Sequence, residues 1–264
     1  ATKSENGTKI VIAQHGGNYG QQKIHPTSLH ESKISNKFLS WGFENDARNK
    51  PLGIIKENIN EIKYNKNNTI ILFETRSRNL YSHTLRVDTG AINSSLYLQK
   101  ICEFFSNLKD VEILDHIRVK MSSTDYGLKD KDFMLKTNKN IKFINPRINT
   151  KLFYKKVKLI IHTFPGTGHL EAMASNVPHL LLNLNDMSLV KKNTRKYFVK
   201  FKKLGIMHDN PISLIEHLKK ISKDPGKWWF SKKIQSLRKK YSNDFAIPNK
   251  NINRDIVKIL KIVK

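Results

Sequence analysis

The sequence predicts an α/β protein with a doubly wound, mostly parallel β-sheet and a helical C-terminal tail. Two observations support this fold class. Short apolar runs alternate with segments of helical periodicity, which is the pattern of parallel strands joined by crossover helices. In addition, the segments that carry glycine and potential functional side chains follow predicted strands, where such sheets place their binding sites. We expect a single domain over residues 1–245 and a basic tail or helix over residues 246–264.

The first part of the chain contains five expected strands and one expected helix. The strands are apolar runs at Lys9–Ala13, at Lys37–Phe43, at Thr69–Glu74, within Val111–Val119 and at Ile141–Ile144. Runs this short, with polar residues between them, indicate buried strands rather than helices. A longer segment, Ile92–Leu108, has apolar residues at helical spacing and is expected to form the helix.

The remainder of the chain continues the alternation. Strands are expected at Val157–His162 and His179–Leu184, and helices at Leu189–Leu204, Pro211–Ile221 and Pro225–Tyr241. The last of these helices has a favourable start, because Asp224 can cap it and Pro225 occupies its first turn.

The composition fits a folded protein with a substantial core. The chain has 264 residues, of which 38% are hydrophobic, and this argues against global disorder. No apolar run approaches the roughly 20 residues that a membrane-spanning helix needs. The first seven residues are polar, without a signal peptide, and the chain begins without Met. We therefore expect a fragment or the second half of a longer protein.

The net charge of +26 favours an anionic partner. Nucleic acid, an anionic membrane surface and nucleotide diphosphates all meet that condition. The lysines are scattered along the whole chain among many Asn and Ile residues, and no zinc-finger spacing, Arg-rich tail or RNA-binding motif is present. We do not expect a nucleic-acid partner, and we keep the anionic membrane surface as an alternative partner.

The sequence contains few residues of the types that bind metals, and their spacing does not match that of known metal sites. Cys102 is the single cysteine, so neither an intrachain disulfide nor a Cys-based zinc site can form. The histidines lack ligand spacing, and no Asp-x-Asp motif follows a strand. We expect no metal, no cofactor and a location in the reducing cytoplasm.

The segment after the strand Val157–His162 carries the strongest functional signal. Gly166 and Gly168 allow a backbone to approach a ligand closely, and a helix beginning near Thr167 would direct N–H groups at a phosphate. Glu171 would face the same crevice and could accept hydrogen bonds from a ribose. The candidate residues for binding a nucleotide, which would be the donor in a transfer reaction, are Thr163, Pro165, Gly166, Thr167, Gly168, His169 and Glu171. For His169, a place on the helix face without ligand contact is an equal alternative.

A second signal follows the first strand. His15 stands at the strand end and is followed by the loop-forming residues Gly16 and Gly17. Histidine has a pKa near neutrality and serves readily as a general base, so His15 is a candidate catalytic residue. The alternative is a histidine that caps the loop by hydrogen bonding. Glu31 is the second candidate, and it would orient His15, bind the acceptor or simply lie in solvent.

A third candidate group lies on the strand expected within Val111–Val119. Arg118 and Lys120 alternate with apolar residues and should point to one side of that strand. There they could bind phosphate groups of a ligand; in GT-B glycosyltransferases, which the chain resembles, a basic residue at this point neutralises the diphosphate of the leaving nucleotide. The alternative is a solvated face in a lysine-rich protein.

These segments together resemble known transferases. The Pro165–Gly168 loop with Glu171-Ala172 and a closing small-x-Pro resembles the nucleotide-sugar signature in the second domain of GT-B glycosyltransferases. The order of His15-Gly-Gly, an acid and Ser35-Asn-x-Phe-x-Ser-Trp-Gly resembles a bacterial family of surface-carbohydrate transferases associated with O-antigen and capsule functions. It is more distantly similar to the glycerophosphotransferases of teichoic-acid synthesis.

The resemblance implies the Rossmann-like, nucleotide-binding half of a GT-B enzyme that works without a metal. It also implies that His15 activates an acceptor hydroxyl. The expected function is transfer of a sugar or polyol phosphate from a nucleotide-activated donor to a carbohydrate or lipid-linked acceptor in surface polysaccharide synthesis. This would take place in the cytoplasm or at the inner face of the cytoplasmic membrane.

Two alternatives stay open at this point. One is a nucleotide-sugar 2-epimerase of the same fold, which needs further acids and a set of basic residues that the sequence does not locate. The other is a non-catalytic basic module that binds nucleic acid or a membrane surface. Steep salt dependence of binding to DNA without nucleotide-sugar affinity would favour the second.

Overall fold

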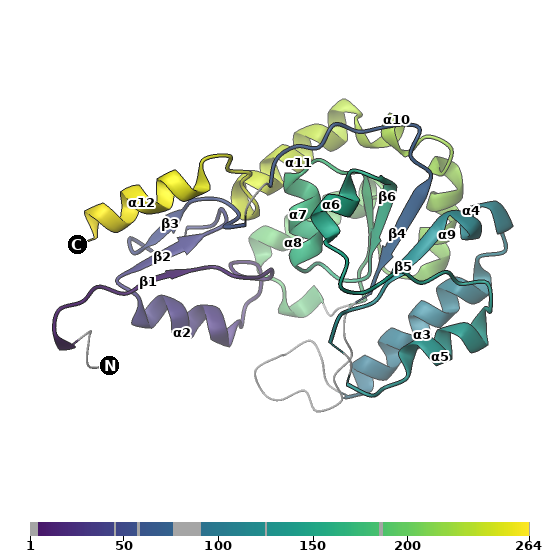
Figure 1. Ribbon diagram of the computed structural model, residues 1–264, viewed down its shortest axis with the longest axis horizontal. Coiled ribbons are helices and arrows are strands. Elements are labelled where there is room, and N and C mark those ends of the chain that lie inside the picture. The colour runs from purple at the N-terminus through teal and green to yellow at the C-terminus, as the bar shows by residue number, and fades with distance from the viewer. Residues whose placement is uncertain are drawn as a thin grey trace.

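The computed structural model describes residues 5–44, 46–56, 59–75, 91–124, 126–184 and 187–263. Within these ranges the strands form two parallel sheets (Figure 1). The first sheet has the order β1-β2-β3 and consists of β1 (Val11–Ala13), β2 (Lys37–Ser40) and β3 (Asn49–Pro51). The expected strands near the N-terminus therefore exist, but they belong to a sheet of their own.

The second sheet is larger and has the order β5-β4-β6-β7-β8. Its strands are β4 (Ile70–Glu74), β5 (Ile117–Lys120), β6 (Val157–His162), β7 (His179–Leu182) and β8 (Met207–His208), and all of its pairings are parallel. After β4 the chain adds β5 on one side and then crosses to add β6 on the other. The switch point of the sheet therefore lies between β4 and β6, and ligands bind at the carboxyl ends of the strands there.

Helices cover both faces of the second sheet. Ile71 and Phe73 of β4 lie in a core with α3 (Ala91–Asn107) and α9 (Pro211–Ile221), whereas Leu72 between them packs with α7 (Thr167–Ala174). The face of α7 also carries α8 (Lys192–Lys203) and α11 (Lys232–Phe245). The other helices of this part are α4 (Val111–His116), α5 (Asp130–Thr137), α6 (Thr150–Tyr154) and α10 (Pro225–Trp229).

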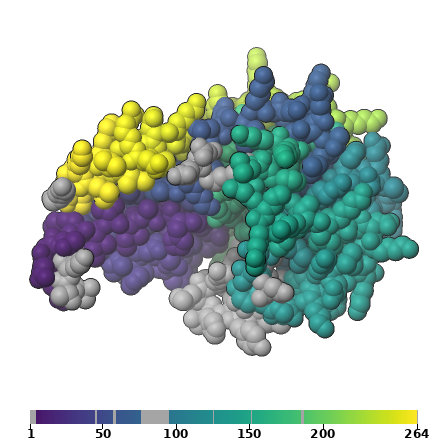
Figure 2. All heavy atoms as spheres, in the orientation of Figure 1, coloured from purple at the N-terminus to yellow at the C-terminus, as the bar shows by residue number. Residues whose placement is uncertain are grey.

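The first sheet is flanked by α2 (Pro26–Ile34) and α12 (Ile252–Ile262), as Figures 1 and 2 show. Helix α2 begins at Pro26 because His25 accepts a hydrogen bond from the Ser28 amide and so caps the helix. The chain returns from α11 to this sheet, since the Ile247 amide donates to the Trp41 carbonyl. The two ends of the chain therefore build one structural unit.

An aromatic core joins the two sheets. Trp41 follows β2, is fully buried and packs with Tyr241 and Phe245 of α11. Next to it, a Cβ atom at Gly42 would lie 2.7 Å from the Phe245 backbone nitrogen, so a glycine is needed for this close approach. The sheets are thus held against each other by packing on α11.

The predicted fold class is confirmed, with three local differences. Ile141–Ile144 is not a strand but makes a single bridge to β5, because Pro146 soon afterwards cannot donate a hydrogen bond. A helix, α4, precedes β5, because Asp110 caps it. The expected helix Pro225–Tyr241 is broken into α10 and α11 at Ser231, which has an extended backbone. No helix among the described residues is long and apolar enough to cross a membrane.

Candidate active site

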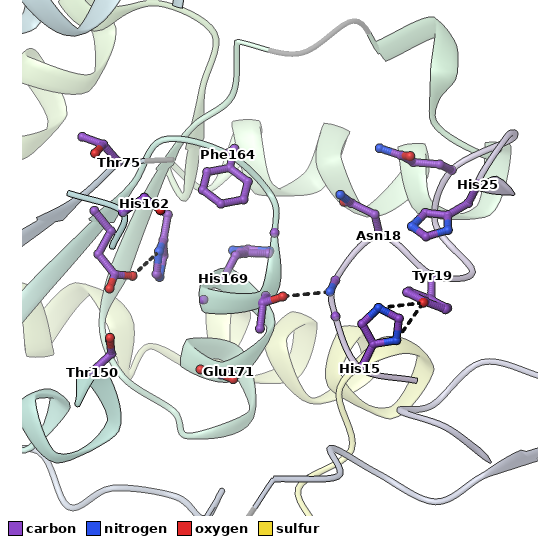
Figure 3. Close-up of a pocket in the computed structure, with 18 of the residues that line it drawn as sticks. His15, Asn18, Tyr19, His25, Thr75, Thr150, His162, Phe164, His169 and Glu171 are labelled. Atoms are coloured by element: carbon purple, nitrogen blue, oxygen red, sulfur yellow. Dashed lines mark hydrogen bonds and ion pairs between the residues drawn. The ribbon is translucent and has the colours of Figure 1, made fainter. Parts of the chain in front are cut away.

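A pocket of about 570 Å³ opens between the loop after β1 and the loop after β6. It lies at the carboxyl ends of β4 and β6, which is the switch point of the second sheet. Its volume falls within the roughly 300–1,000 Å³ of pockets that bind small molecules. Figure 3 shows His15 and Tyr19 on one side of this pocket and His162 and Thr150 on the other.

His15 is held by two neighbours. Its Nδ1 atom lies 3.5 Å from Glu31 Oε1 and 3.1 Å from the Tyr19 hydroxyl. The Tyr19 hydroxyl donates to Glu31 Oε2 at 2.9 Å, and burial together with Glu31 raises its pKa well above the usual value. The His15 side chain is 66% exposed at the pocket, whereas that of Glu31 is 17% exposed. Glu31 therefore stands behind His15, where an orienting carboxylate would be needed.

The His15 loop touches the glycine loop after β6 directly. The Gly17 amide donates to Thr167 Oγ1 at 2.9 Å. A Cβ atom at Gly17 would lie 2.7 Å from the Gly166 carbonyl carbon and from the Thr167 nitrogen, so a side chain there would push the loops apart. His15 and the N-terminus of α7 consequently face the same pocket (Figure 3).

The N-terminus of α7 has the features of an anion site. Thr167 is its first residue, and the capping position is Gly166, which has no side chain with which to satisfy the N–H groups. A Cβ at Gly166 would lie 2.0 Å from the Phe164 ring, so the loop requires glycine. The first turn of α7 can therefore direct N–H groups and the positive end of the helix dipole at a phosphate.

Glu171 lines the pocket, and a lysine that we did not predict binds it. Lys56 Nζ lies 2.5 Å from Glu171 Oε1, and the Glu171 side chain is 7% exposed. Lys56 belongs to the segment between the two sheets and lies 5.9 Å from the centre of the Trp41 ring. No motif marks Lys56, because the chain is rich in lysine throughout.

A second ionisable pair was also missed. Glu74 ends β4, His162 ends β6, and His162 Nδ1 lies 3.1 Å from Glu74 Oε2. The signal in the sequence was a polar residue at the end of two apolar strands, which by itself does not reveal that the strands are neighbours.

Several predicted residues lie outside the pocket. Thr163 is buried and joins β6 to β4, because its hydroxyl donates to the Glu74 carbonyl at 2.9 Å. Pro165 is buried and does not line the pocket. The Arg118 guanidinium binds two backbone carbonyls next to it in the chain, whereas Lys120 on the same strand does line the pocket. The structure therefore brings together His15, Gly16, Gly17, Lys120, Gly166, Thr167, Gly168, His169 and Glu171.

The side chain of His169 is directed into the core. It is fully buried, and its Nδ1 lies 3.1 Å from His179 Nε2. Burial lowers the pKa of His179 to about 3 and that of His169 well below its usual value, so both are neutral at pH 7. No group of His, Cys, Asp and Glu in the described part of the chain is arranged to hold a metal ion.

A parallel α/β fold with a glycine loop at its switch point belongs to the doubly wound class, whose members bind their ligands at this edge of the sheet. Comparison of sequences identifies the family: the chain belongs to the LIC12162 family of transferases, whose profile matches residues 1–260. No curated protein sequence matches the chain.

Solved structures share the fold. The S. aureus MnaA–UDP co-structure matches with a TM-score of 0.53 at 12% identity, over 98% of this chain and 70% of that one. TarM matches with a TM-score of 0.53 at 12% identity, over 97% of this chain and 50% of that one. A variant of the wall teichoic acid polymerase TagF matches with a TM-score of 0.51 at 10% identity, over 97% of this chain and 68% of that one. The chain thus spans between 50% and 70% of the length of these structures.

Proposed function

We propose that the chain takes part in moving a sugar or polyol phosphate from a nucleotide-activated donor to a hydroxyl acceptor during surface polysaccharide synthesis. The observation that carries this proposal is the hydrogen bond between the Gly17 amide and Thr167 Oγ1. It joins the loop of a candidate base to the candidate phosphate site, so both ends of a transfer reaction meet in one pocket. Membership of a transferase family supports the same reaction class.

The donor would bind along α7. Its phosphates accept hydrogen bonds from the first turn of the helix, and Glu171 accepts hydrogen bonds from the ribose. Lys120 lines the pocket and is better situated than Arg118 to neutralise the leaving nucleotide phosphate. No metal or cofactor is needed in this scheme.

The acceptor would bind beside His15. His15 takes the proton of the acceptor hydroxyl while its oxygen bonds to the transferred carbon or phosphorus, and the bond to the nucleotide phosphate breaks. The nucleotide leaves with the electron pair of that bond. Glu31 and Tyr19 hold the imidazole in position for this proton transfer.

The test of the donor site is calorimetric titration with UDP, CDP and GDP. We expect saturable binding of one nucleotide by the wild-type chain and at least about 10-fold weaker binding by Glu171→Ala, because a hydrogen bond to a charged group is lost. Glu103→Ala is the matched control, since Glu103 forms an ion pair with Lys100 on α3. If none of the three nucleotides binds the folded wild-type chain, the proposal is wrong.

A nucleotide-sugar 2-epimerase is the second candidate, and one observation favours it. Glu74 and His162 line the same pocket as Glu171, and Glu74 is a further acid that the sequence alone did not locate. The two candidates differ in product, because an epimerase inverts C2 of the nucleotide sugar without any acceptor. Inverted product in the absence of an acceptor would replace the transferase proposal.

We further propose that the enzyme works in the cytoplasm at an anionic membrane surface, with a lipid-linked or carbohydrate acceptor. The net charge of +26 and the exposed side chains Val257, Leu260 and Ile262 of α12, between basic residues, support this. Cosedimentation with phosphatidylglycerol vesicles that high salt abolishes is the expected result. Equal binding to neutral vesicles would contradict it.

A further inference from the structure

The pocket contains one pair of side chains that the transfer chemistry above does not use. Glu74 and His162 are register partners on adjacent parallel strands, and each is the last residue of its strand. His162 Nδ1 lies 3.1 Å from Glu74 Oε2, and the two side chains are 3% and 13% exposed, respectively. Their strands flank the switch point of the sheet, so the pair lies where this type of fold binds ligands.

Burial of this pair lowers the stability of the fold. A buried carboxylate and imidazole lose hydration, and apolar residues of similar size would often be at least as stable. Space for the pair exists because a Cβ at Gly168 would lie 3.0 Å from Glu74 Oε2 and 3.1 Å from His162 Cε1. His162 Nε2 is buried and has no hydrogen-bond partner among the described residues. An incompletely satisfied polar pair in a pocket wall calls for an explanation other than packing.

The position of the pair identifies which part of a donor it would meet. Figure 3 shows α7 between His15 on one side and His162 on the other. With the phosphates at the N-terminus of α7, the transferred group extends towards His15 and the nucleoside extends towards His162. Glu171 and Tyr154 also line the pocket, and the Tyr154 hydroxyl donates to the Gly168 carbonyl at 3.4 Å.

Two carboxylates are close to this part of the pocket. Glu74, Tyr154 and Glu171 all line the pocket, and burial followed by the charges of the two carboxylates raises the pKa of Tyr154 well above its usual value. His162 contacts Oε2 of Glu74, and Lys56 contacts Oε1 of Glu171. One oxygen of each carboxylate therefore has capacity to accept a hydroxyl group.

We propose that Glu74, held by His162, is a second ribose-binding carboxylate. Together with Glu171 it would bind the 2′,3′-diol of the donor nucleotide, with one hydroxyl on each carboxylate, and so select ribonucleotides. His162 is a positioning residue, because it fixes the Glu74 carboxylate without touching the ribose. This inference rests on the proposed function, since it requires a nucleotide in the pocket.

The test compares nucleotides that differ by one hydroxyl group. Wild-type chain, Glu74→Gln and Glu171→Gln are titrated with UDP, CDP or GDP, whichever binds, and with its 2′-deoxy and 3′-deoxy analogues. We expect the wild type to bind the ribonucleotide about 10-fold more tightly than either analogue, because each loses a hydrogen bond to a charged acceptor. Glu74→Gln should lose most of the preference for one hydroxyl, and Glu171→Gln most of the preference for the other.

Variants of His162 separate positioning from packing. His162→Asn keeps an N–H donor near the Nδ1 position and should retain most of the hydroxyl preference, whereas His162→Leu should lose it. Glu103→Gln on α3 is the control and should behave as the wild type. Unchanged affinity of Glu74→Gln for the deoxy analogue would also show that the pocket is intact, so unfolding cannot produce the expected result.

Three outcomes would overturn this inference alone. If the wild type binds ribonucleotide and deoxy analogues equally, or if Glu74→Gln keeps the full preference, Glu74 does not bind the ribose. If Glu74→Gln weakens all of the nucleotides equally, Glu74 acts on the fold of the pocket and not on a hydroxyl. In each case the nucleotide still binds the wild type and the proposed function stands. Failure of the wild type to bind any nucleoside diphosphate would overturn both.

Discussion

A histidine acts as a base when one ring nitrogen reaches the substrate and the other is held by the protein. At His15 the holding groups are the Glu31 carboxylate beside Nδ1 and the Tyr19 hydroxyl, which lies 3.1 Å from Nδ1 and 3.3 Å from Nε2, and the side chain is exposed to the pocket. Glu31 comes from α2 and Tyr19 from the loop before it, so the first sheet and its helix set the direction of the imidazole.

Replacing His15 with Ala should stop transfer without affecting donor binding. Loss of a general base lowers the rate by about 10²- to 10⁴-fold, while the phosphate site on α7 is untouched. The rate is measured as nucleotide released in the presence of acceptor, and nucleotide affinity is measured by calorimetry. A variant that retains the wild-type rate would show that His15 is not the base.

Gly17 should be far less tolerant of a methyl group than its neighbour Gly16. An alanine Cβ at Gly17 would lie 2.7 Å from backbone atoms of Gly166 and Thr167, whereas at Gly16 the nearest atom, Thr167 Oγ1, is 3.7 Å away. We expect Gly17→Ala to destabilise the fold by about 1–3 kcal/mol, which is typical of overpacking, and to weaken nucleotide binding. Gly16→Ala is the matched control. Equal thermal unfolding temperatures for the two variants would contradict the close contact between the loops.

At the scale of elements, the contact between α7 and β7 depends on two neutral histidines. His169 of α7 and His179 of β7 are fully buried, and their rings lie 5.0 Å apart. Protonation of either histidine would place a positive charge in this aromatic core. No carboxylate among the described residues contacts either ring to compensate that charge. The contact that positions the helix with the anion site therefore weakens in acid.

Stability should fall as the pH drops below the usual histidine pKa of 6.5. Burial lowers the pKa of His179 to about 3 in the folded state, so between these values the unfolded chain binds more protons than the folded one. Each buried histidine of this kind lowers the free energy of unfolding by up to about 1.4 kcal/mol for every pH unit below 6.5, as long as the pH stays above its folded-state pKa. We expect the free energy of unfolding from urea titrations to decrease from pH 7 to pH 5.

The variant His179→Asn isolates this contribution. Asn does not titrate, so the dependence of its unfolding free energy on pH should be shallower than that of the wild type by about one proton. His30→Asn is the control, because His30 is exposed on α2. A variant with the wild-type slope would assign the acid sensitivity to other groups.

At the scale of the whole molecule, the ion pair of Lys56 and Glu171 connects the segment between the sheets to α7. The same lysine lies over the Trp41 ring of the aromatic core. The Glu171 side chain is nearly buried, so loss of Lys56 would leave its carboxylate without its counter-charge.

Lys56→Met should therefore destabilise the protein by about 2 kcal/mol, which is the range for leaving a buried charged acceptor unpaired. The double variant Lys56→Met/Glu171→Gln should recover part of this loss, because it removes the unpaired charge. Lys100→Met breaks a more exposed ion pair on α3 and should change stability by less than about 1 kcal/mol. Urea unfolding gives these values, and a cost for Lys56→Met no larger than that for Lys100→Met would contradict the prediction.

The local features of this protein follow from the sequence by itself. Apolar runs such as those of β4 and β6 identify strands, and the glycines after His15 and around Thr167 identify loops, because periodicity and the absence of a side chain are properties of short segments. His15 was found for the same reason, since a histidine before two glycines at a strand end is a local pattern.

The tertiary structure decided which distant residues meet. Glu74 and His162 are paired because β4 and β6 became neighbours, and Lys56 reaches Glu171 because the segment between the sheets passes along α7. The division into two sheets depends on packing against α11 across the whole chain. Arg118 was expected in the pocket and instead binds nearby carbonyls. Such contacts depend on the order of strands and on the packing of faces, and neither is a property of a short segment.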